Sequence, residues 1–424
     1  MIRSALANRT AVAWIAVLTT AVLVAAGCTS SKKLSTDSAT ATTGAITLAA
    51  ADPTGVLKTL VTTWNAGHAG QAVTLKPLPA DPAGRRDVLV ENLQKHNPGF
   101  DVIATDLSST AEFAANSWIR PLTGARTIAV SGLAAPAVSA GTYRGILYSE
   151  PITADAGLLF YRSDLLKAPP TTWSKLAADC QVAQTASLAC FSGQYAQGED
   201  LTVNAIEAIY AGGGHLLSAD GKTADVDTVG ARKGLQFLAD SYAKKVIPAS
   251  AITYRTEQSV RAFGSGALLM LRADAEAYAA LSATSSAVAG KFKVAALPGS
   301  LGPAPAAFRG LGVSINSSGQ NQQTALEFAR FLQSAPAQRT LLSKASLAPA
   351  LTSLYGDAGL RSKYPFLATL QQSWQGAQPL LVSPAYQAIS DAVADSAYAV
   401  VTGTKKPAQA SKDLQATLSG LPLG

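Results

Sequence analysis

Residues 148–167 read Tyr-Ser-Glu-Pro-Ile-Thr-Ala-Asp-Ala-Gly-Leu-Leu-Phe-Tyr-Arg-Ser-Asp-Leu-Leu-Lys, and residues 168–173 continue as Ala-Pro-Pro-Thr-Thr-Trp. A short strand pattern ends at Pro151, polar residues interrupt it, and an apolar strand resumes from Leu158 to Tyr161. Proline restricts its own backbone and that of the preceding residue, so the chain is predicted to be extended here. We interpret the stretch as a crossing between two lobes, with Thr153 to Asp155 lining the cleft between them.

The length and composition of the chain agree with two lobes. It has 424 residues, of which 48% are hydrophobic and 14% are charged, which is typical of a globular protein with substantial cores. Between residues 46 and 106, strand patterns alternate with a helical pattern at Val56, Leu57, Leu60, Val61 and Trp64. Such alternation predicts an α/β fold with a mostly parallel sheet and helices on both of its faces.

Two later segments are predicted to cross between the lobes as well. Residues 309–316, Arg-Gly-Leu-Gly-Val-Ser-Ile-Asn, form a second strand crossing, and Leu347-Ala-Pro349 forms a third. We therefore assign residues 45–151 and 309–348 to the N-terminal lobe. Residues 152–308 and 349–424 are assigned to the C-terminal lobe.

The N-terminus has the three parts of a secretory signal. Arg3 and Arg9 precede an apolar run that is too short for a membrane span, and Val-Ala-Ala-Gly-Cys follows, ending at Cys28. This ending resembles a bacterial lipobox, in which the cysteine becomes the first mature residue and carries lipid. Residues 1–27 are thus predicted to be a lipoprotein signal peptide and residues 28–44 a flexible tether. A plain signal peptide and an uncleaved anchor are the alternatives.

The net charge of +7 does not indicate a nucleic-acid partner. No run of basic residues is longer than two, as at Arg85-Arg86, whereas nucleic-acid binding requires a clustered basic face. In an exported chain, Cys180 and Cys190 are expected to form a disulfide rather than two free thiols. The three histidines are far apart in the sequence, so no metal site is expected.

No catalytic motif is visible in the sequence. A Gly-x-Ser-x-Gly elbow, a His-Glu-x-x-His motif and a Walker loop are all absent. The glycines at 212–214 are predicted to end a helix rather than to cradle a phosphate, because no Lys-Ser/Thr follows them. Asp220, Asp225 and Asp227 lack the spacing of a calcium loop and are predicted to belong to a turn.

Short acids, amides and aromatics are predicted to surround the cleft, since ligands of such sheets sit beyond the carboxyl ends of the strands. Carboxylates and amides pair with sugar hydroxyls, while aromatic rings cover the apolar face of a sugar. The candidates are Asp52, Asp106, Asp155, Gln194, Tyr195, Gln197, Glu199, Arg272 and Tyr386.

Several motifs, taken in order, resemble the extracellular solute-binding proteins of carbohydrate ABC importers, the maltose-binding-protein-like family. They are residues 148–173, residues 308–316 with the Ala-Leu-Glu-Phe-Ala-Arg-Phe-Leu run that follows, and residues 263–270. The resemblance covers nearly all of the chain after the tether. It implies a two-lobe periplasmic-binding-protein-like fold with hinge crossings and an interlobe ligand cleft, and it implies no enzymatic activity and no cofactor.

Within that family the chain is similar to the trehalose-binding lipoproteins of actinobacteria. Residues 101–106, Gln197-Gly-Glu199 and residues 384–388 carry this similarity, which implies sugar contacts near Asp106, Asp155, Gln197, Glu199 and Gly310. The chain departs from that group in three places: Asp155 replaces an asparagine, the region of Leu271-Arg272 lacks a tryptophan, and Leu380 replaces an arginine. These departures argue against trehalose itself.

The predicted function is capture of a sugar, a disaccharide or short oligosaccharide, and its delivery to a membrane permease. The protein is expected to be a monomer held outside the plasma membrane by lipidated Cys28. A glycerophosphodiester that meets Arg272, or an amino sugar that meets Asp155, is an alternative ligand for the same fold. A secreted glycoside hydrolase using Asp155 and Glu199 is a further alternative.

Overall fold

The computed structural model describes residues 42–305, 307–374, 377–379 and 381–424, which belong to one compact unit. The predicted signal peptide, Cys28, the tether up to residue 41 and Leu380 lie outside the described residues.

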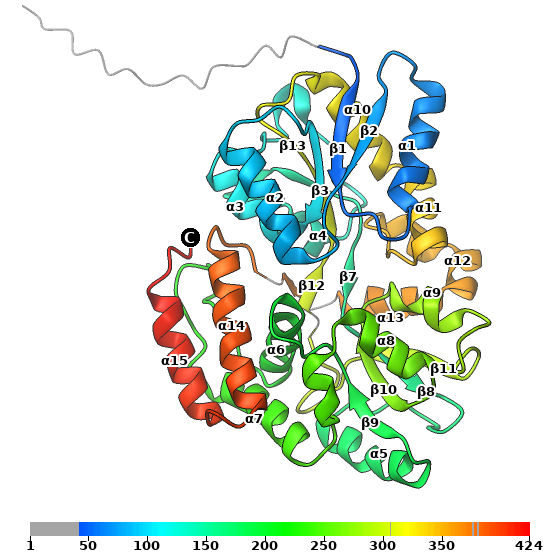
Figure 1. Ribbon diagram of the computed structural model, residues 1–424, viewed down its shortest axis with the longest axis vertical. Coiled ribbons are helices and arrows are strands. Elements are labelled where there is room, and N and C mark those ends of the chain that lie inside the picture. Colours follow the sequence, from blue (N-terminus) through cyan, green and yellow to red (C-terminus); the bar gives the residue numbers. More distant parts are fainter. Residues whose placement is uncertain (1–41, 306, 375–376, 380) are drawn as a thin grey trace, which may run out of the picture. The chain divides into compact units, whose positions relative to one another are not determined.

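The first of two main sheets has the strand order β2-β1-β3-β13-β6 (Figure 1). Its strands are β1 (Ile46–Ala50), β2 (Val73–Pro77), β3 (Val102–Asp106), β6 (Ser149–Pro151) and β13 (Leu311–Ile315). β1 runs parallel to β2 and β3, whereas β13 is antiparallel to β3 and β6.

Helices cover both faces of this first sheet because its strands are apolar on both sides. Leu48 and Ala50 of β1 join the core formed with α1, α10 and α11, whereas Ala49 joins the core formed with α2 and α3. The helices of this part are α1 (Val56–Gly67), α2 (Pro82–Gln94), α3 (Thr110–Ala115), α4 (Ala135–Ala140), α10 (Gln322–Gln333) and α11 (Ala335–Ala345).

The second main sheet has the strand order β11-β8-β10-β9 (Figure 1). Its strands are β8 (Leu158–Arg162), β9 (Ala189–Ser192), β10 (Leu268–Ala273) and β11 (Phe292–Ala296). Along β8, Leu159 and Tyr161 enter a core with α5, α6, α7 and α14, while Leu158 and Phe160 enter a core with α8, α9 and α13. The alternation fits a strand that is buried on both faces.

Helices surround the second sheet and form the two cores on its faces. They are α5 (Trp173–Thr185), α6 (Glu199–Ala211), α7 (Val229–Ala243), α8 (Thr256–Gly264), α9 (Ala277–Ser282), α12 (Ala358–Lys363), α13 (Phe366–Ser373), α14 (Tyr386–Val401) and α15 (Pro407–Ser419). α6 ends at Gly212, and Gly213 then takes a positive φ of 86°, so these glycines terminate a helix as predicted.

A third, small sheet joins the two main ones and contains the predicted crossings. Its order is β14-β12-β7, with β7 (Asp155–Ala156), β12 (Ala307–Arg309) and β14 (Gln378–Pro379). The third predicted crossing lies beside the first, since the Ala154 N–H donates to the carbonyl of Ala348 at 2.9 Å. A short hairpin, β4 (Thr142–Tyr143) and β5 (Ile146–Leu147), and four single turns complete the secondary structure: η1 (Leu107–Ser109), η2 (Gly124–Arg126), η3 (Ala249–Thr253) and η4 (Thr352–Gly356).

The prediction of a mostly parallel sheet is confirmed for the strands between residues 46 and 106, since β1 is parallel to β2 and β3, but it does not extend to the rest of the two main sheets. β8 is antiparallel to both β10 and β11, and β13 is antiparallel to both of its neighbours. β8 and β13 each enter a main sheet directly from a crossing and not through a helix packed on that sheet. The connection that makes neighbouring strands parallel is therefore missing at these two strands.

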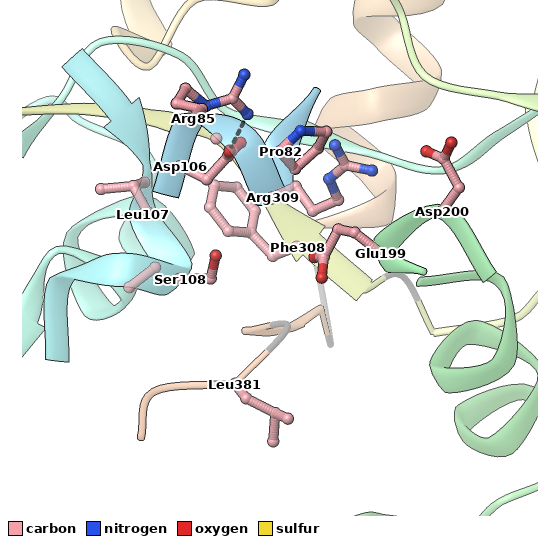
Figure 2. A pocket seen from close by; sticks show the side chains of 12 residues that line it. Pro82, Arg85, Asp106, Leu107, Ser108, Glu199, Asp200, Phe308, Arg309 and Leu381 are labelled. Atoms are coloured by element: carbon pink, nitrogen blue, oxygen red, sulfur yellow. Dashed lines mark hydrogen bonds and ion pairs between the residues drawn. The ribbon is translucent and has the colours of Figure 1, made fainter. Parts of the chain in front are cut away.

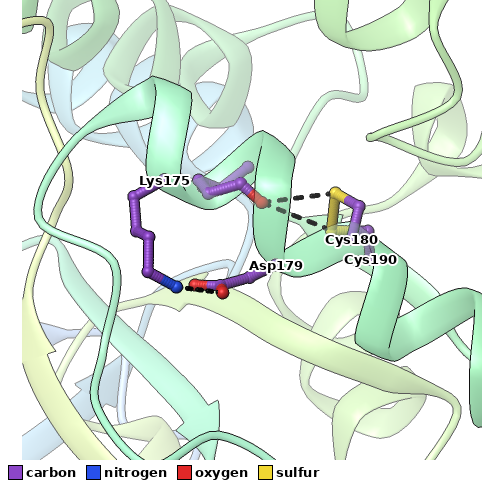
Figure 3. The surroundings of a disulfide bond; sticks show 5 residues. Lys175, Asp179, Cys180 and Cys190 are labelled. Carbon is purple, nitrogen blue, oxygen red and sulfur yellow. Dashed lines mark hydrogen bonds and ion pairs between the residues drawn. A yellow bond between two sulfur atoms is a disulfide. The ribbon is translucent and has the colours of Figure 1, made fainter.

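Cys180 and Cys190 form a disulfide that links α5 to β9 (Figure 3). Both sulfur atoms are buried in the core of the second sheet, where they lie 3.4 and 4.0 Å from the carbonyl oxygen of Leu176. In the same helix, the half-exposed Lys175 pairs with the buried side chain of Asp179. Closing so short a loop stabilises a domain by about 2–4 kcal/mol in typical cases.

Glu150 in β6 is a buried carboxyl group without a hydrogen-bond partner. Its side chain is 0% exposed, and neither carboxyl oxygen meets a donor among the described residues. Burial raises the pKa of Glu150 to about 8, against the opposing charge of Arg330. The folded protein thus holds a proton on Glu150 at a pH where the unfolded chain, with its usual value of 4.5, has lost it.

We expect Glu150→Gln to flatten the pH dependence of stability. A raised carboxyl pKa means that the native state binds more protons than the unfolded chain, so the free energy of unfolding falls as pH rises from about 5 to about 8. The amide does not titrate, and the variant should gain stability relative to the parent across this window. Urea unfolding at pH 5, 6.5 and 8 measures the effect. Glu91→Gln, at an exposed helix position, is the control, and equal pH slopes for the parent and the Glu150 variant would contradict the prediction.

Candidate functional site

A hollow with a volume of about 510 Å³ lies where the small sheet meets both main parts of the molecule (Figure 2). The residues that line it are Pro82, Arg85, Asp106, Leu107, Ser108, Ala140, Glu199, Asp200, Phe308, Arg309, Gly310 and Leu381.

A second hollow, with a volume of about 400 Å³, adjoins the first and shares five of its residues. It adds Arg86, Thr105, Ser109, Glu112, Tyr386 and Gln387. We call the two hollows together the cleft.

Several side chains of the cleft come from the ends of strands and helices. β3 stops at Asp106, and Arg85 lies in the first turn of α2, which begins at Pro82. On the opposite side, Glu199 and Asp200 form the first turn of α6. Acids are favoured at a helix N-terminus, so α6 can hold two of them in the cleft.

Gly310 forms the floor of the cleft between β12 and β13. Its carbonyl oxygen accepts a hydrogen bond of 2.9 Å from the N–H of Leu107. A Cβ atom at this position would lie 2.5 Å from the carbonyl oxygen of Thr153, which is closer than real Cβ contacts come. Only glycine lets the second crossing pass this close to the first.

The arginine on the α2 side of the cleft is matched by a carboxylate. Arg85 Nη2 lies 2.8 Å from Asp106 Oδ2, and their side chains are only partly exposed. Nearby, Arg86 pairs with Glu112. These pairs leave carboxylate lone pairs and guanidinium N–H groups that a ligand with many hydroxyls can use.

On the α6 side, the cleft presents the acids Glu199 and Asp200, and the charge of Arg309 acts on both. Glu199 accepts hydrogen bonds from the hydroxyls of Tyr386 and Ser390, at 2.6 Å for Ser390. Asp200 has Arg255 as its nearest cation, at 4.0 Å. Burial is the first cause that raises the pKa of both Glu199 and Asp200.

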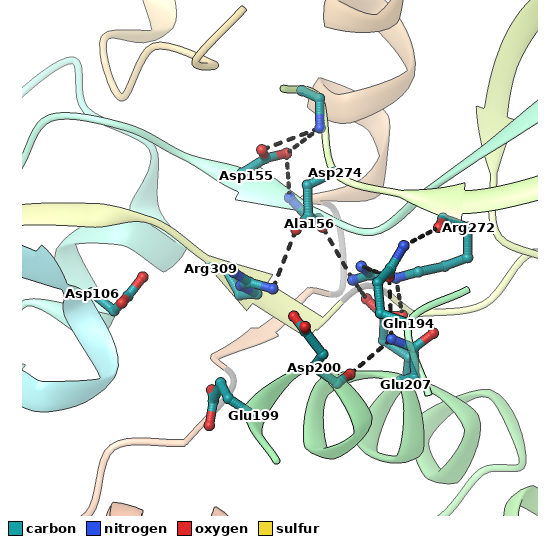
Figure 4. A network of polar contacts seen from close by, with 12 residues as sticks. Asp106, Asp155, Ala156, Gln194, Glu199, Asp200, Glu207, Arg272, Asp274 and Arg309 are labelled. Atoms are coloured by element: carbon teal, nitrogen blue, oxygen red, sulfur yellow. Dashed lines mark hydrogen bonds and ion pairs between the residues drawn. The ribbon is translucent and has the colours of Figure 1, made fainter. Parts of the chain in front are cut away.

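Arg309 enters the cleft from β12 and connects to an ion network in the core (Figure 4). Arg309 Nη1 lies 3.2 Å from Asp274 Oδ2, and Asp274 Oδ1 lies 3.1 Å from Arg272 Nη2. Although burial acts to raise it, the guanidinium groups of Arg272 and Arg309 lower the pKa of Asp274. Asp274 therefore stays ionised between two arginines.

The structure brings four of the ten candidate residues together in the cleft and leaves six outside its lining. Asp106, Glu199, Gly310 and Tyr386 line it. Asp52 instead accepts hydrogen bonds from the N–H groups of Leu57 and Lys58 and so caps the start of α1.

The other candidates outside the lining are Asp155, Gln194, Tyr195, Gln197 and Arg272, and each has contacts elsewhere. Gln194 donates to Ser259 at 2.7 Å, and Tyr195 is buried in the core of the second sheet. Gln197 donates to Asp395 on the surface at 2.7 Å. Arg272 makes a two-fold ion pair with Glu207 inside the core.

Asp155 is buried beside the cleft. The crossing residues Thr153 to Asp155 were expected to line the cleft, but they do not. Asp155 accepts from the N–H groups of Ala156 and Ala275, and burial, followed by the charge of Asp274, raises its pKa. The lining comes from the second crossing, residues 308–310, because Thr153 turns its hydroxyl inward to accept from the N–H of Leu311.

Sequence reasoning missed Arg85, Asp200, Phe308 and Arg309. Asp200 directly follows a predicted site residue at a helix start, and Phe308 and Arg309 precede the predicted Gly310, so proximity to these positions was an available signal. Arg85 was noted only as half of a basic pair on the surface. Its role depends on the contact with Asp106, which no local pattern encodes.

The match to known families decides the class of protein. Residues 59–365 match the model of a family described as bacterial extracellular solute-binding protein. The chain belongs to this family. A relative from Deinococcus radiodurans, named "Probable ABC transporter-binding protein", is 34% identical to this solute-binding protein over 300 residues, which are 66% of this chain and 70% of the relative.

Solved structures show the same two-lobe fold. A maltose-bound MalE3 of T. maritima superimposes with a TM-score of 0.82 at 26% identity and covers 88% of this solute-binding protein and 98% of its own chain. The GacH receptor of Streptomyces glaucescens, solved without ligand and with acarbose, has a TM-score of 0.78 at 20% identity and covers 89% of this chain and 99% of its own chain. No helix within the described ranges of this solute-binding protein has both the length and the apolar composition that a membrane crossing needs.

We expect Gly310→Ala to destabilise the protein, because the added methyl group collides with the Thr153 carbonyl and forces the two crossings apart. Overpacking of this kind costs about 1–3 kcal/mol. Chemical denaturation should show a lower midpoint for this variant. Gly67→Ala is the matched control, since nothing lies within 4 Å of that position in α1 and alanine favours a helix. A Gly310 variant as stable as the Gly67 variant would contradict the close approach.

Proposed function

We propose that the protein captures a sugar in the cleft and delivers it to the membrane permease of an ABC importer, without performing chemistry on it. The observation that carries this proposal is the lining of the cleft, in which carboxylates and guanidinium groups stand beside the apolar Phe308, Leu107 and Leu381. Sugar hydroxyls need both donors and acceptors, and the C–H face of a sugar needs an apolar surface. The maltose and acarbose complexes of proteins with the same fold support the proposal.

We propose that the sugar, a disaccharide or short oligosaccharide, is enclosed by the two lobes as they close about the crossings. The lobe boundaries remain those proposed from the sequence, residues 45–151 with 309–348 and residues 152–308 with 349–424. The membership of the two main sheets supports this division, since the first contains β1, β2, β3, β6 and β13 and the second contains β8 to β11. Hinge closure at a few crossing strands is a common way to enclose a ligand.

Two alternatives lose the residues on which they depended. Arg272 is held by Glu207 and Asp274 in the core and does not line the cleft, so it is not placed to meet a glycerophosphodiester. A retaining or inverting glycosidase needs two carboxyl groups facing one bond. Of the predicted pair, Glu199 lines the cleft, whereas Asp155 is hydrogen-bonded to the backbone beside it.

An amino sugar is the second candidate ligand, favoured by the acids on the α6 side. Glu199 and Asp200 line the cleft side by side in sequence, and an ammonium group would interact favourably with their charge.

We also propose that the protein works outside the plasma membrane as a monomer anchored by lipid on Cys28. The support is the sequence of the N-terminus, with its basic residues, apolar run and lipobox-like ending. The mature cysteine would carry the lipid, and the following tether would leave the sugar-binding part free in solution.

A thermal-shift panel tests the sugar proposal. The mature protein is heated with maltose, trehalose, glucosamine and glycerophosphocholine, and we expect a sugar to raise the melting temperature by a few degrees at saturating concentration. Asp106→Asn should reduce the shift, because Asp106 lines the cleft. Asp413→Asn, which alters an exposed pair with Lys405, should retain it.

The arms of the panel separate the candidates. A shift with glucosamine alone selects the amino sugar, whereas a shift with glycerophosphocholine alone would reject a carbohydrate ligand. The absence of a shift with maltose, trehalose and glucosamine would overturn the sugar proposal.

Metabolic labelling with a radioactive fatty acid tests the lipid anchor. We expect the full-length protein to incorporate the label and to fractionate with membranes in a bacterium that processes lipoproteins. Cys28→Ser removes the only sulfur that the lipobox offers and should abolish both, while Cys180→Ser with Cys190→Ser serves as the control that keeps Cys28. Label retained by the Cys28 variant would contradict the proposal.

A further inference from the structure

Four charged side chains form a continuous line from the core of the second main sheet to the cleft (Figure 4). We call them the ion chain: Glu207, Arg272, Asp274 and Arg309. Arg272 meets the two carboxyl oxygens of Glu207 at 2.5 and 2.7 Å, and Asp274 bridges Arg272 at 3.1 Å and Arg309 at 3.2 Å. The charges alternate in sign along the whole line.

The ion chain is buried at its inner end and partly exposed at its outer end. The side chains of Arg272 and Glu207 are 4% and 5% exposed, those of Asp274 and Arg309 are 19% and 30% exposed, and only Arg309 lines the cleft. Gln194 completes the inner end. It accepts from Arg272 Nη1 at 3.1 Å and donates to the carbonyl of Arg272 at 2.9 Å.

Three different elements hold the members of the ion chain. Glu207 lies two turns into α6, Arg272 is the fifth residue of β10, Asp274 directly follows that strand, and Arg309 ends β12. A shift of any one of these elements would change the position of the guanidinium group in the cleft. Through these ion pairs, the positions of α6 and β10 affect the position of Arg309 in the second crossing.

Stability alone is a poor explanation for such a line of charges. Burying ions costs desolvation energy that their attraction often only balances, and apolar residues of similar size serve a core equally well. Removing one partner, in contrast, leaves the next ion uncompensated. Without Glu207, Arg272 would draw on both oxygens of Asp274 and take one of them from Arg309.

We propose that Arg309 binds the ligand, and that Glu207, Arg272 and Asp274 are positioning residues that hold its guanidinium group in the cleft. This inference rests on the proposed function. Because Asp274 already balances the charge of Arg309, the remaining N–H groups of the planar fork suit two neighbouring hydroxyl oxygens of a sugar better than a phosphate. The ion chain therefore sets both the direction of these donors and the preference for an uncharged part of the ligand.

A double-mutant cycle tests the ion chain. Calorimetry measures the dissociation constant of whichever of maltose, trehalose and glucosamine gives the largest thermal shift, for the parent, Arg309→Ala, Glu207→Gln and the double variant. We expect Arg309→Ala to weaken binding about tenfold or more, as loss of a charge-assisted hydrogen bond does. Glu207→Gln should weaken binding in the parent but not further in the Arg309→Ala background.

Stability provides the second readout of the same cycle. Glu207→Gln should lower the urea midpoint both with and without Arg309, because Arg272 loses its buried partner in either background. Asp164→Asn is the matched control, since it alters a two-fold pair with Arg162 on the surface of the same part of the molecule and should leave affinity unchanged. If Glu207→Gln does not fold, Asp274→Asn replaces it in the cycle.

The outcomes separate the inference from the proposed function. Parent-like affinity in Arg309→Ala, or an effect of Glu207→Gln that persists in its absence, would overturn the inference while the sugar proposal stands. A parent protein that binds none of the three sugars would overturn both.

Discussion

Leu311 ties the first and second crossings together through hydrogen bonds of its backbone groups. Its carbonyl oxygen accepts from the N–H groups of Ile152 at 2.9 Å and Thr153 at 3.3 Å, and its own N–H donates to the hydroxyl of Thr153 at 2.7 Å. Buried backbone groups must find partners, so these bonds fix the first and second crossings against each other. Gly310 precedes Leu311 and gives the room for this contact, because a Cβ atom there would collide with the Thr153 carbonyl oxygen. The direction of β12, the placement of Arg309 and the floor of the cleft all follow from it.

The charges of the cleft are arranged so that each arginine is balanced from its own side. Arg85 is paired with Asp106 at the end of β3, and Arg309 is paired with Asp274 at the end of β10. These pairs are only partly exposed, so water screens them less than it would screen surface pairs. The α6 side keeps an excess of acid although the chain as a whole carries a net charge of +7. The charge of the cleft is therefore a local property that the composition does not reveal.

The order of strands and helices and the position of the crossings were predictable from sequence, because they depend on local periodicity and on proline and glycine. The strand from Leu158 and the helix from Val56 are examples. The site was predictable only where an element end points directly into the cleft, as at Asp106 and Glu199. Asp52 does not line the cleft because it caps the start of α1 through the nearby N–H groups of Leu57 and Lys58. Arg272 does not line it because it pairs with Glu207, and a pairing between residues so distant in the sequence leaves no local pattern. The antiparallel direction of β8 likewise depends on how the crossing enters the sheet and not on the residue pattern of the strand.

α6 presents Glu199 and Asp200 to the cleft and Glu207 to the core on one rigid helix. This arrangement of α6 limits how the ligand preference of the proposed site can change in evolution. A descendant that exchanges the acids at the start of α6 can do so locally, but one that shifts or rotates the helix to admit a larger ligand disturbs the partner of Arg272 at the same time. New selectivity in this lineage should therefore arise by replacing side chains at the tip of α6, with the body of the helix and its buried acid retained.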